Sequence, residues 1–189
     1  MPETPLDGMR IAILVSTDFE QVELTEPMEA LVQAGADVKI VAPTSGTITG
    51  MEHDEKKDDF NVDLTLDQAS PDEFDGVLLP GGALNADFLR VVPKAQQFVQ
   101  KMNADGKPMA IICHAPWLLV SAGLVKGRTL TSYHTIQDDI RNAGGNWQDR
   151  EVIRDKNWVT SRQPGDIQAF NREMLKMFAE LKSAGKRAA

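Results

Sequence analysis

The chain has 189 residues, of which 42% are hydrophobic and 25% are charged. These fractions are close to the globular average, which excludes a disordered or fibrous chain, and the length predicts one folded domain. The formal net charge of -8 repels phosphate backbones and anionic lipids, so we expect neither a nucleic acid nor a membrane as partner. No hydrophobic stretch approaches the roughly 20 residues that span a bilayer.

The chain contains a single cysteine, Cys113, so it cannot form an internal disulfide. Its first residues lack the basic and apolar regions of a signal peptide. We therefore expect a cytoplasmic protein.

The first 42 residues predict a strand, a helix and a second strand. Residues 10–16 are apolar without alternation, which indicates a strand buried on both faces. Helical spacing of apolar residues follows over 24–32 and ends at Gly35, with Pro27 in the first turn or at a kink. Residues 38–42 form the next short apolar run. Such a unit implies parallel strands joined by a right-handed crossover.

The segment after this unit is polar. Residues 43–59 include the charge run 52–59 and predict an exposed excursion that can form a hairpin. His53 lies inside this run, and we interpret the run as solvated because no metal-ligand spacing accompanies it. Residues 62–67 alternate between apolar and polar, which is typical of a half-exposed strand or extended segment.

The rest of the chain continues the alternation of strands and helices. The predicted elements are strands at 76–79 and 108–112, helices near 93–103, 117–120, 136–143 and 166–181, and a hairpin over 151–161. This order predicts an α/β fold, a three-layer sandwich with a mostly parallel central sheet. We expect one domain over residues 1–189, with its core at about 9–181 and frayed termini.

Candidate chemistry gathers where strands end, because sites in such sheets lie at the carboxyl ends of the strands. The strand at 108–112 runs into Cys113, His114, Ala115 and Pro116 and then into a helix. This is the layout of a nucleophile elbow, in which a tight turn presents the reactive side chain above the sheet. From position alone, Cys113 is equally well a small buried hydrophobe.

Two neighbouring strand ends carry residues that could assist a nucleophilic Cys113. Gly81 and Gly82 follow the strand at 76–79 and can offer backbone N–H groups to an oxyanion, although a glycine pair is also an ordinary tight turn. Glu20 follows the first strand. A carboxyl beside a thiolate is useful when it donates a hydrogen bond or accepts the thiol proton, and otherwise it is a solvated acid.

Five motifs in order resemble the PfpI-type intracellular cysteine peptidase family, within the superfamily of the parkinsonism-associated deglycase. They are DFEQVELTEP (18–27), LLPGG (78–82), AIICHAPWLLVSAG (110–123), TLTSYHTIQDD (129–139) and WVTSRQPGD (158–166). The resemblance covers about residues 9–181. It implies a flavodoxin-like, class I glutamine amidotransferase-like fold.

The resemblance also implies roles for individual residues. Cys113 matches the nucleophile, His114 its neighbouring base, and Glu20 the acid that hydrogen-bonds the sulfur and guides its oxidation. Asp87 is the best match to a third acid that reaches the site from an adjoining subunit, although one extra residue precedes it. This implies a homo-oligomer, a dimer or a hexamer. The candidates for binding the oxyanion or the substrate are Gly81, Gly82 and Ala115.

The function expected from the resemblance is a stress-protective, cofactor-independent cysteine hydrolase that acts on reactive carbonyls, in the manner of a glyoxalase or deglycase. The alternatives are an intracellular cysteine peptidase with peptide substrates, and a redox-sensing or chaperone-like stress protein without turnover. We expect no metal and no cofactor. A glutamine amidotransferase is excluded, because its histidine lies near the C-terminus and this chain has none after His134.

Overall fold

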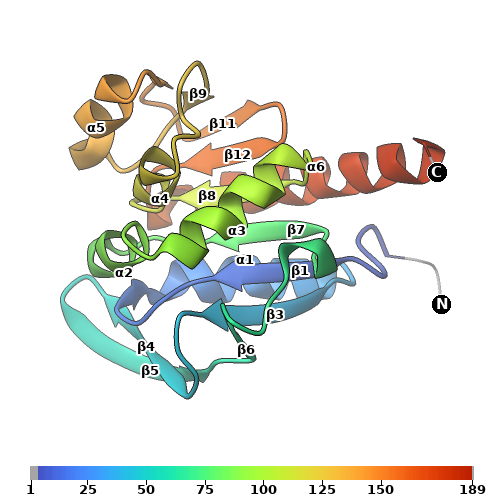
Figure 1. Ribbon diagram of the computed structural model, residues 1–189, viewed down its shortest axis with the longest axis horizontal. Helices are drawn as coiled ribbons and strands as arrows, with labels where there is room; N and C mark the ends of the chain where they lie inside the picture. Colours follow the sequence, from blue (N-terminus) through green and yellow to red (C-terminus); the bar gives the residue numbers. More distant parts are fainter. Residues whose placement is uncertain (1–3, 189) are drawn as a thin grey trace.

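A computed structural model describes residues 4–188, with a seven-stranded sheet at the centre (Figure 1). Its strands are, in spatial order, β11 (Val152–Asp155), β12 (Trp158–Ser161), β8 (Met109–Ile112), β7 (Gly76–Leu79), β1 (Arg10–Leu14), β3 (Asp37–Ala42) and β6 (Leu64–Thr65). All neighbouring strands are parallel except the pair β11 and β12, which forms the hairpin expected over 151–161. The predicted mostly parallel sheet is confirmed.

The middle strands form because their sequences are apolar on both faces. Every residue of β7 and β8 is buried, and so is every residue of β1 after Arg10. A strand covered on both faces has no solvent side, so its sequence shows no alternation. Burying each large aliphatic side chain of such a strand stabilises the fold by roughly 1.5–3 kcal/mol.

Helices cover both faces of the sheet and complete the three layers (Figure 1). The helices α1 (Gln21–Gln33) and α6 (Ile167–Ala188) pack on one face through a cluster that includes Leu24, Leu31, Phe170 and Phe178. The other face carries α2 (Ala83–Leu89), α3 (Pro93–Ala104), α4 (Pro116–Ser121) and α5 (Gln137–Asn142), whose cluster includes Leu89, Phe98, Leu118 and Ile140. The α/β sandwich predicted from the sequence is confirmed.

The first helix begins earlier than its apolar spacing suggested. It starts at Gln21, so Pro27 lies in the second turn; of the two alternatives for Pro27, the first turn is wrong and a kink stays a prediction. Proline has no N–H to donate to the carbonyl of Glu23 one turn earlier. The earlier start also brings Glu23 into the first turn of the helix.

A three-stranded side sheet lies at the carboxyl end of the central strands, beside α2 (Figure 1). It consists of β2 (Phe19–Glu20), β4 (Thr47–Glu52) and β5 (Glu55–Asn61). The hairpin of β4 and β5 confirms the excursion predicted for residues 43–59. Two hydrogen bonds join this hairpin to the start of α1. Gln21 Nε2 donates to Asp58 Oδ2 at 2.7 Å, and Gln21 Oε1 accepts from the Asp58 N–H at 2.9 Å.

Several short elements have no counterpart among the expectations. They are α2, the paired strands β9 (Thr129–Leu130) and β10 (Asn146–Trp147), and the 3-10 helices η1 (Pro71–Glu73), η2 (His134–Ile136) and η3 (Pro164–Asp166). Within residues 4–188, no helix is both long enough and apolar enough to cross a membrane.

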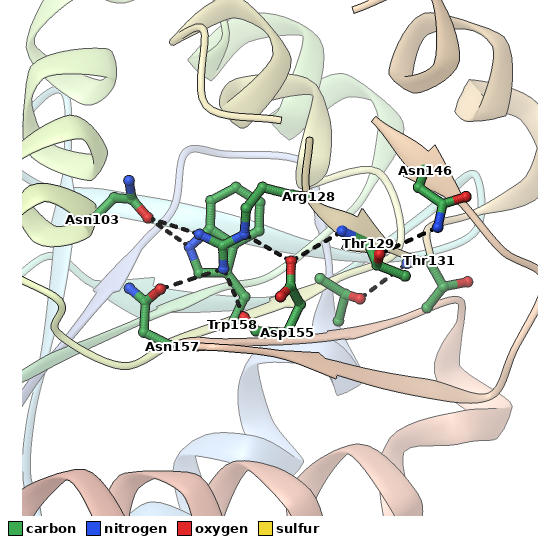
Figure 2. A network of polar contacts seen from close by, with 9 residues as sticks. Asn103, Arg128, Thr129, Thr131, Asn146, Asp155, Asn157 and Trp158 are labelled. Atoms are coloured by element: carbon green, nitrogen blue, oxygen red, sulfur yellow. Dashed lines mark hydrogen bonds and ion pairs between the residues drawn. The ribbon is translucent and has the colours of Figure 1, made fainter. Parts of the chain in front are cut away.

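A polar network anchors β9 to the central sheet (Figure 2). Arg128 lies over the ring of Trp158 at 3.7 Å, and its Nε donates to Asp155 Oδ2 at 2.9 Å. The same carboxylate oxygen accepts from the N–H of Thr129 at 3.0 Å. The network therefore fixes the start of the segment that continues to Tyr133.

Candidate active site

Cys113 occupies a strained turn between β8 and α4. Its φ of 63° lies in the left-handed region, which costs a non-glycine residue about 1–2 kcal/mol. Two hydrogen bonds hold this conformation, because the Cys113 N–H donates to Ser161 O at 3.0 Å and the Cys113 carbonyl accepts from the Tyr133 N–H at 2.8 Å. The side chain is 5% exposed. The turn has the geometry of a nucleophile elbow.

The glycine pair after β7 lies directly against this elbow. Gly82 has a φ of 88°, and its N–H donates a hydrogen bond to the sulfur of Cys113. A Cβ added at Gly81 would lie 2.5 Å from the Cβ of Cys113, and one at Gly82 would lie 2.8 Å from the Cα of Phe19. Both positions therefore require glycine, and this close approach exposes the Gly82 N–H to the sulfur.

Asn85 holds the glycine turn in place, and sequence reasoning missed it. The side chain is wholly buried, and its Oδ1 accepts from the Ser16 N–H at 2.7 Å. Its Nδ2 donates to Pro80 O at 3.1 Å and to Gly81 O at 2.8 Å. One amide thus ties the ends of β1 and β7 together. No local pattern indicates this role, since the helix that carries Asn85 was not predicted.

The acid that meets the sulfur is Glu23. Its side chain is wholly buried, its Oε2 accepts from the Gly81 N–H at 2.8 Å, and the carboxyl hydrogen-bonds Cys113. Burial raises the pKa of Glu23 to about 8. The carboxyl is therefore protonated at neutral pH. Its Oε1 is buried and has no hydrogen-bond partner among the described residues.

The expectation that Glu20 hydrogen-bonds the sulfur is corrected by this geometry. Glu20 ends β2 just before the helix, is half-buried, and its Oε2 accepts from the His53 N–H at 3.2 Å. Glu23 lies on the buried face of α1, with Pro27 and Leu31 at the following steps of four. Helical periodicity was the sequence signal that could have identified Glu23, because it places this acid on the same face of the helix as the buried Pro27 and Leu31.

The ionisations of Cys113 and Glu23 oppose each other. Burial raises the pKa of the Cys113 thiol, and a negative charge on Glu23 raises it further, whereas the backbone N–H groups of Gly82 and His114 favour the thiolate. When Glu23 is protonated, the like charge disappears and its hydroxyl can donate to the sulfur. Protonation of Glu23 therefore removes one of the causes that raise the pKa of the thiol.

His114, the residue after Cys113, also contacts the sulfur. Its Nδ1 lies 3.2 Å from Cys113 Sγ, and its Nε2 lies 3.3 Å from Thr135 Oγ1. The ring stacks on Tyr133 with centroids 4.7 Å apart. Burial lowers the pKa of His114 to about 4, so the imidazole is neutral at pH 7 and can accept a proton. Tyr133 and Thr135 were not expected to contact it.

A cavity of about 420 Å³ opens above the sulfur. Its lining comprises Asp18, Glu20, Glu23, Met51, His53, Gly82, Ala83, Leu84, Cys113, His114, Tyr133, Gln163, Pro164 and Gly165. The hairpin of β4 and β5 thus supplies one wall. The charge run 52–59 is exposed, as expected, and His53 in its turn also lines the cavity, which was not expected.

Three other expected site residues lie outside this lining. Gly81 is buried and its N–H donates to Glu23 Oε2, so the expectation that it serves an oxyanion is wrong. Ala115 is buried in the core with α4 and its N–H donates to Ile112 O, so it cannot serve an oxyanion. Asp87 is exposed on α2, and its role at a neighbour's site stays a prediction. Among the residues that the structure describes, no three His, Cys, Asp or Glu side chains converge as metal ligands.

The model of the DJ-1/PfpI family matches residues 9–177 of this chain. The chain belongs to the DJ-1/PfpI family. It is 47% identical to the deglycase PfpI of Pyrococcus furiosus over 169 residues, which is 89% of this chain and 99% of that protein. It is 39% identical to protein/nucleic acid deglycase 2 of Escherichia coli, over 89% of this chain and 96% of the relative.

Solved structures of this DJ-1/PfpI family share the fold. The crystal structure of DJ-1beta from Drosophila melanogaster superposes with a TM-score of 0.82 at 25% identity, over 90% of each chain. The expected class I glutamine amidotransferase-like fold is thereby confirmed.

Proposed function

We propose that this DJ-1/PfpI protein is a stress-protective deglycase, a cysteine hydrolase that removes reactive dicarbonyls such as methylglyoxal from amines and thiols. The observation that carries the proposal is the elbow cysteine Cys113 beside the wholly buried Glu23, with His114 Nδ1 at 3.2 Å from the sulfur. This arrangement supports a nucleophile and proton transfer without a cofactor. The names of the relatives agree with it.

The reaction follows from the placement of these groups. The Cys113 thiolate displaces the amine of a methylglyoxal adduct from the hemiaminal carbon, and the amine leaves with one proton. The sulfur then carries a hemithioacetal. The N–H groups of Gly82 and His114 lie where they can stabilise an oxyanion at this carbon.

The second half of the reaction needs no external oxidant. A proton moves from the carbon that bears sulfur to the adjoining carbonyl carbon, with His114 as the base. The first carbon is oxidised to a thioester and the second is reduced to an alcohol, so the electrons balance within the substrate. Water then hydrolyses the thioester, releasing lactate and restoring the thiol. The sum is adduct plus water to free amine plus lactate.

The test is release of lactate and free amine from a methylglyoxal-treated amino acid. We expect Cys113→Ser and His114→Gln to lower kcat/KM by about 1000-fold or more. His134→Gln is the matched control, since His134 is exposed and does not line the cavity. Equal activity of Cys113→Ser and the native chain would refute the proposal.

The sequence analysis left two alternative functions to the deglycase. Hydrolysis of unfolded casein that depends on Cys113 would support a cysteine peptidase, whose intermediate is an acyl-enzyme. Oxidation of Cys113 in the absence of any turnover would support a redox-sensing or chaperone-like protein. The deglycase is preferred because a cavity of about 420 Å³ suits a small adduct better than an extended peptide.

A homo-oligomer belongs to the same proposal. Beside Asp87, the surface of α2 exposes Leu84 at 61% and Phe88 at 51%, and Val91, two residues after the helix, is 69% exposed. An exposed apolar patch next to the cavity fits contact with a second copy, which would bring Asp87 to its neighbour's site. The cytoplasmic location stays a prediction, tested by cell fractionation.

Mixing two inactive variants tests the shared site. Protomers with Cys113→Ser retain Asp87, and protomers with Asp87→Ala retain Cys113. If sites are shared, mixed oligomers formed by co-expression regain part of the activity. Activity of the mixture equal to the sum of the separate variants, or a monomer by light scattering, would contradict the shared site.

A further inference from the structure

The turn at residues 80–82, between β7 and α2, contacts the active site but has little rigidity of its own. Glycine moves more freely in φ and ψ than any other residue, and this turn contains two. The Gly82 N–H nevertheless donates to the sulfur of Cys113, and the Gly81 N–H donates to Glu23 Oε2 at 2.8 Å. A group outside the turn is therefore needed to hold these two N–H groups in place.

The buried amide of Asn85 contacts this turn with all of its hydrogen-bonding groups. Both hydrogens of an amide nitrogen can donate, and here Nδ2 donates to Pro80 O at 3.1 Å and to Gly81 O at 2.8 Å. The side-chain oxygen accepts from the Ser16 N–H at 2.7 Å. The reverse orientation of the amide would place its oxygen against two carbonyl oxygens, so the partners fix which end is nitrogen.

The two carbonyls that Asn85 binds belong to the same peptide units as the two N–H groups that face the site. The carbonyl of Pro80 and the N–H of Gly81 form one planar unit, and the carbonyl of Gly81 and the N–H of Gly82 form the next. Both units are trans, so the N–H of each points away from its carbonyl. Binding of the carbonyls on the side of α2 therefore directs the N–H groups toward the elbow.

We propose that Asn85 is a positioning residue for the thiolate of Cys113, because it aims the N–H of Gly82 at the sulfur and the N–H of Gly81 at Glu23. Asn85 is absent from the lining of the cavity, so it acts through the turn and not on a bound molecule. Its effect on turnover rests on the deglycase function proposed above, in which the Gly82 N–H also stabilises the oxyanion. Its effect on the thiol does not.

The contribution of the turn to the reactivity of the sulfur has a definite direction. A hydrogen bond from the Gly82 N–H favours the charged form of the thiol and lowers its pKa, against the larger effect of burial. When the turn loses the amide of Asn85, its glycines can rotate and this hydrogen bond weakens. The thiolate should then form at higher pH, and a smaller fraction of Cys113 should react at pH 7.

The experiment follows alkylation of Cys113 by iodoacetamide from pH 5 to 10 in the native chain, Asn85→Ala and Asn85→Ser. Serine carries one hydroxyl hydrogen, so it can replace at most one of the two donations of the amide. Asp75→Ala is the matched control. Asp75 Oδ2 accepts from the Arg10 N–H at 2.8 Å, so it joins the amino ends of the two strands whose carboxyl ends Asn85 joins.

We expect Asn85→Ala to slow alkylation at pH 7 by about tenfold, the usual scale for losing a hydrogen bond to a charged group. The pH at which the rate reaches half its maximum should rise. Asn85→Ser should show a smaller loss, about threefold, and Asp75→Ala should stay within about twofold of the native rate at every pH. In turnover of a methylglyoxal-treated amino acid, Asn85→Ala should lower kcat by about tenfold and change KM by less than about twofold.

The outcomes separate positioning from general stabilisation. A native alkylation profile in Asn85→Ala would overturn the proposal, and so would an equal slowing in Asp75→Ala. Urea denaturation shows whether each variant is folded, and if Asn85→Ala is not, a native profile in Asn85→Ser would overturn the proposal.

The same measurements distinguish this inference from the deglycase function. Slowed alkylation in Asn85→Ala, with no lactate released by the native chain, would contradict the deglycase function alone. Release of lactate by the native chain, with a native alkylation profile in Asn85→Ala, would contradict the role of Asn85 alone.

Discussion

At the scale of single residues, the reactive thiol depends on the protonation of its neighbour. Glu23 is wholly buried and hydrogen-bonds Cys113, and burial raises its pKa to about 8. Below that pH the sulfur faces a neutral donor, and above it a second negative charge. The proton on Glu23 therefore decides how readily the thiolate forms.

Substitution of Glu23 tests this dependence. Glu23→Gln keeps a neutral donor at every pH, so the alkylation rate of Cys113 should lose the inflection near pH 8 that the native chain shows. Glu23→Leu leaves the buried N–H of Gly81 unpaired and removes the donor, so the rate at pH 7 should fall by about tenfold or more. Iodoacetamide rates from pH 5 to 10 measure both, and Cys113 is the single cysteine that can react.

An unchanged inflection in Glu23→Gln would assign it to another group. His114 also contacts the sulfur, but its pKa is lowered to about 4, so its inflection would fall at acid pH and cannot account for one near pH 8. The two assignments are therefore separated by about four pH units.

At the scale of elements, the segment after β9 depends on the network around Arg128 (Figure 2). Arg128 pairs with Asp155 while its guanidinium covers Trp158, and its side chain is 10% exposed. The chain continues from this anchor to Tyr133, which stacks on His114. A distant polar cluster thus supports the geometry of the active site.

Removal of this guanidinium should be costly. Arg128→Met leaves Asp155 with the Thr129 N–H alone and strips Asn103 and Asn157 of a partner, so we expect a loss of about 3 kcal/mol in the free energy of unfolding. Hydrogen exchange should also quicken over residues 128–135. Urea denaturation and exchange mass spectrometry measure the two effects.

The matched control lies on the neighbouring strand. Arg154→Met breaks an ion pair with Glu180 at 2.6 Å whose side chains are 30% and 47% exposed, and surface pairs contribute about 0–1 kcal/mol. Equal destabilisation by both variants would contradict a special role for Arg128.

At the scale of the whole molecule, two buried groups shape stability in opposite directions. Burial raises the pKa of Glu23 from 4.5 to about 8, so the folded state holds this proton more tightly than the unfolded chain. Burial lowers the pKa of His114 from 6.5 to about 4, so the folded state releases that proton more readily. Between pH 4.5 and 6.5 the two contributions offset each other, because each state binds one proton.

This balance predicts the pH dependence of stability. From pH 6.5 to 8 the folded state alone retains the Glu23 proton, so the contribution of these groups to the free energy of unfolding should fall by roughly 2 kcal/mol. In Glu23→Gln the fall should vanish, and stability should instead rise from pH 4.5 to 6.5 as the unfolded chain loses its His114 proton. Urea denaturation at half-unit pH steps measures both curves. Parallel curves for the two proteins would refute the assignment.

The arrangement of the molecule was largely accessible from the sequence. Residues 10–14, 76–79 and 109–112 are apolar runs bounded by turns, and such local patterns predicted β1, β7 and β8 and the position of Cys113 at a strand end. The short elements α2, β9 and β10 were missed, because their few residues are ordered by tertiary contacts rather than by periodicity. That the chain folds as one domain stays a prediction.

The sequence by itself determined the strand ends and the elbow, since these depend on neighbours along the chain. The need for glycine at positions 81 and 82 was decided by contacts with Cys113 and Phe19, which are distant in sequence. Only the tertiary structure decided that Glu23 and not Glu20 meets the sulfur, because one helical turn separates the two and the start of α1 sets which one faces Cys113. It also decided that Asn85 holds the glycine turn and that the hairpin brings His53 to the cavity. These relations join segments that are far apart in sequence, and no local pattern encodes such distances.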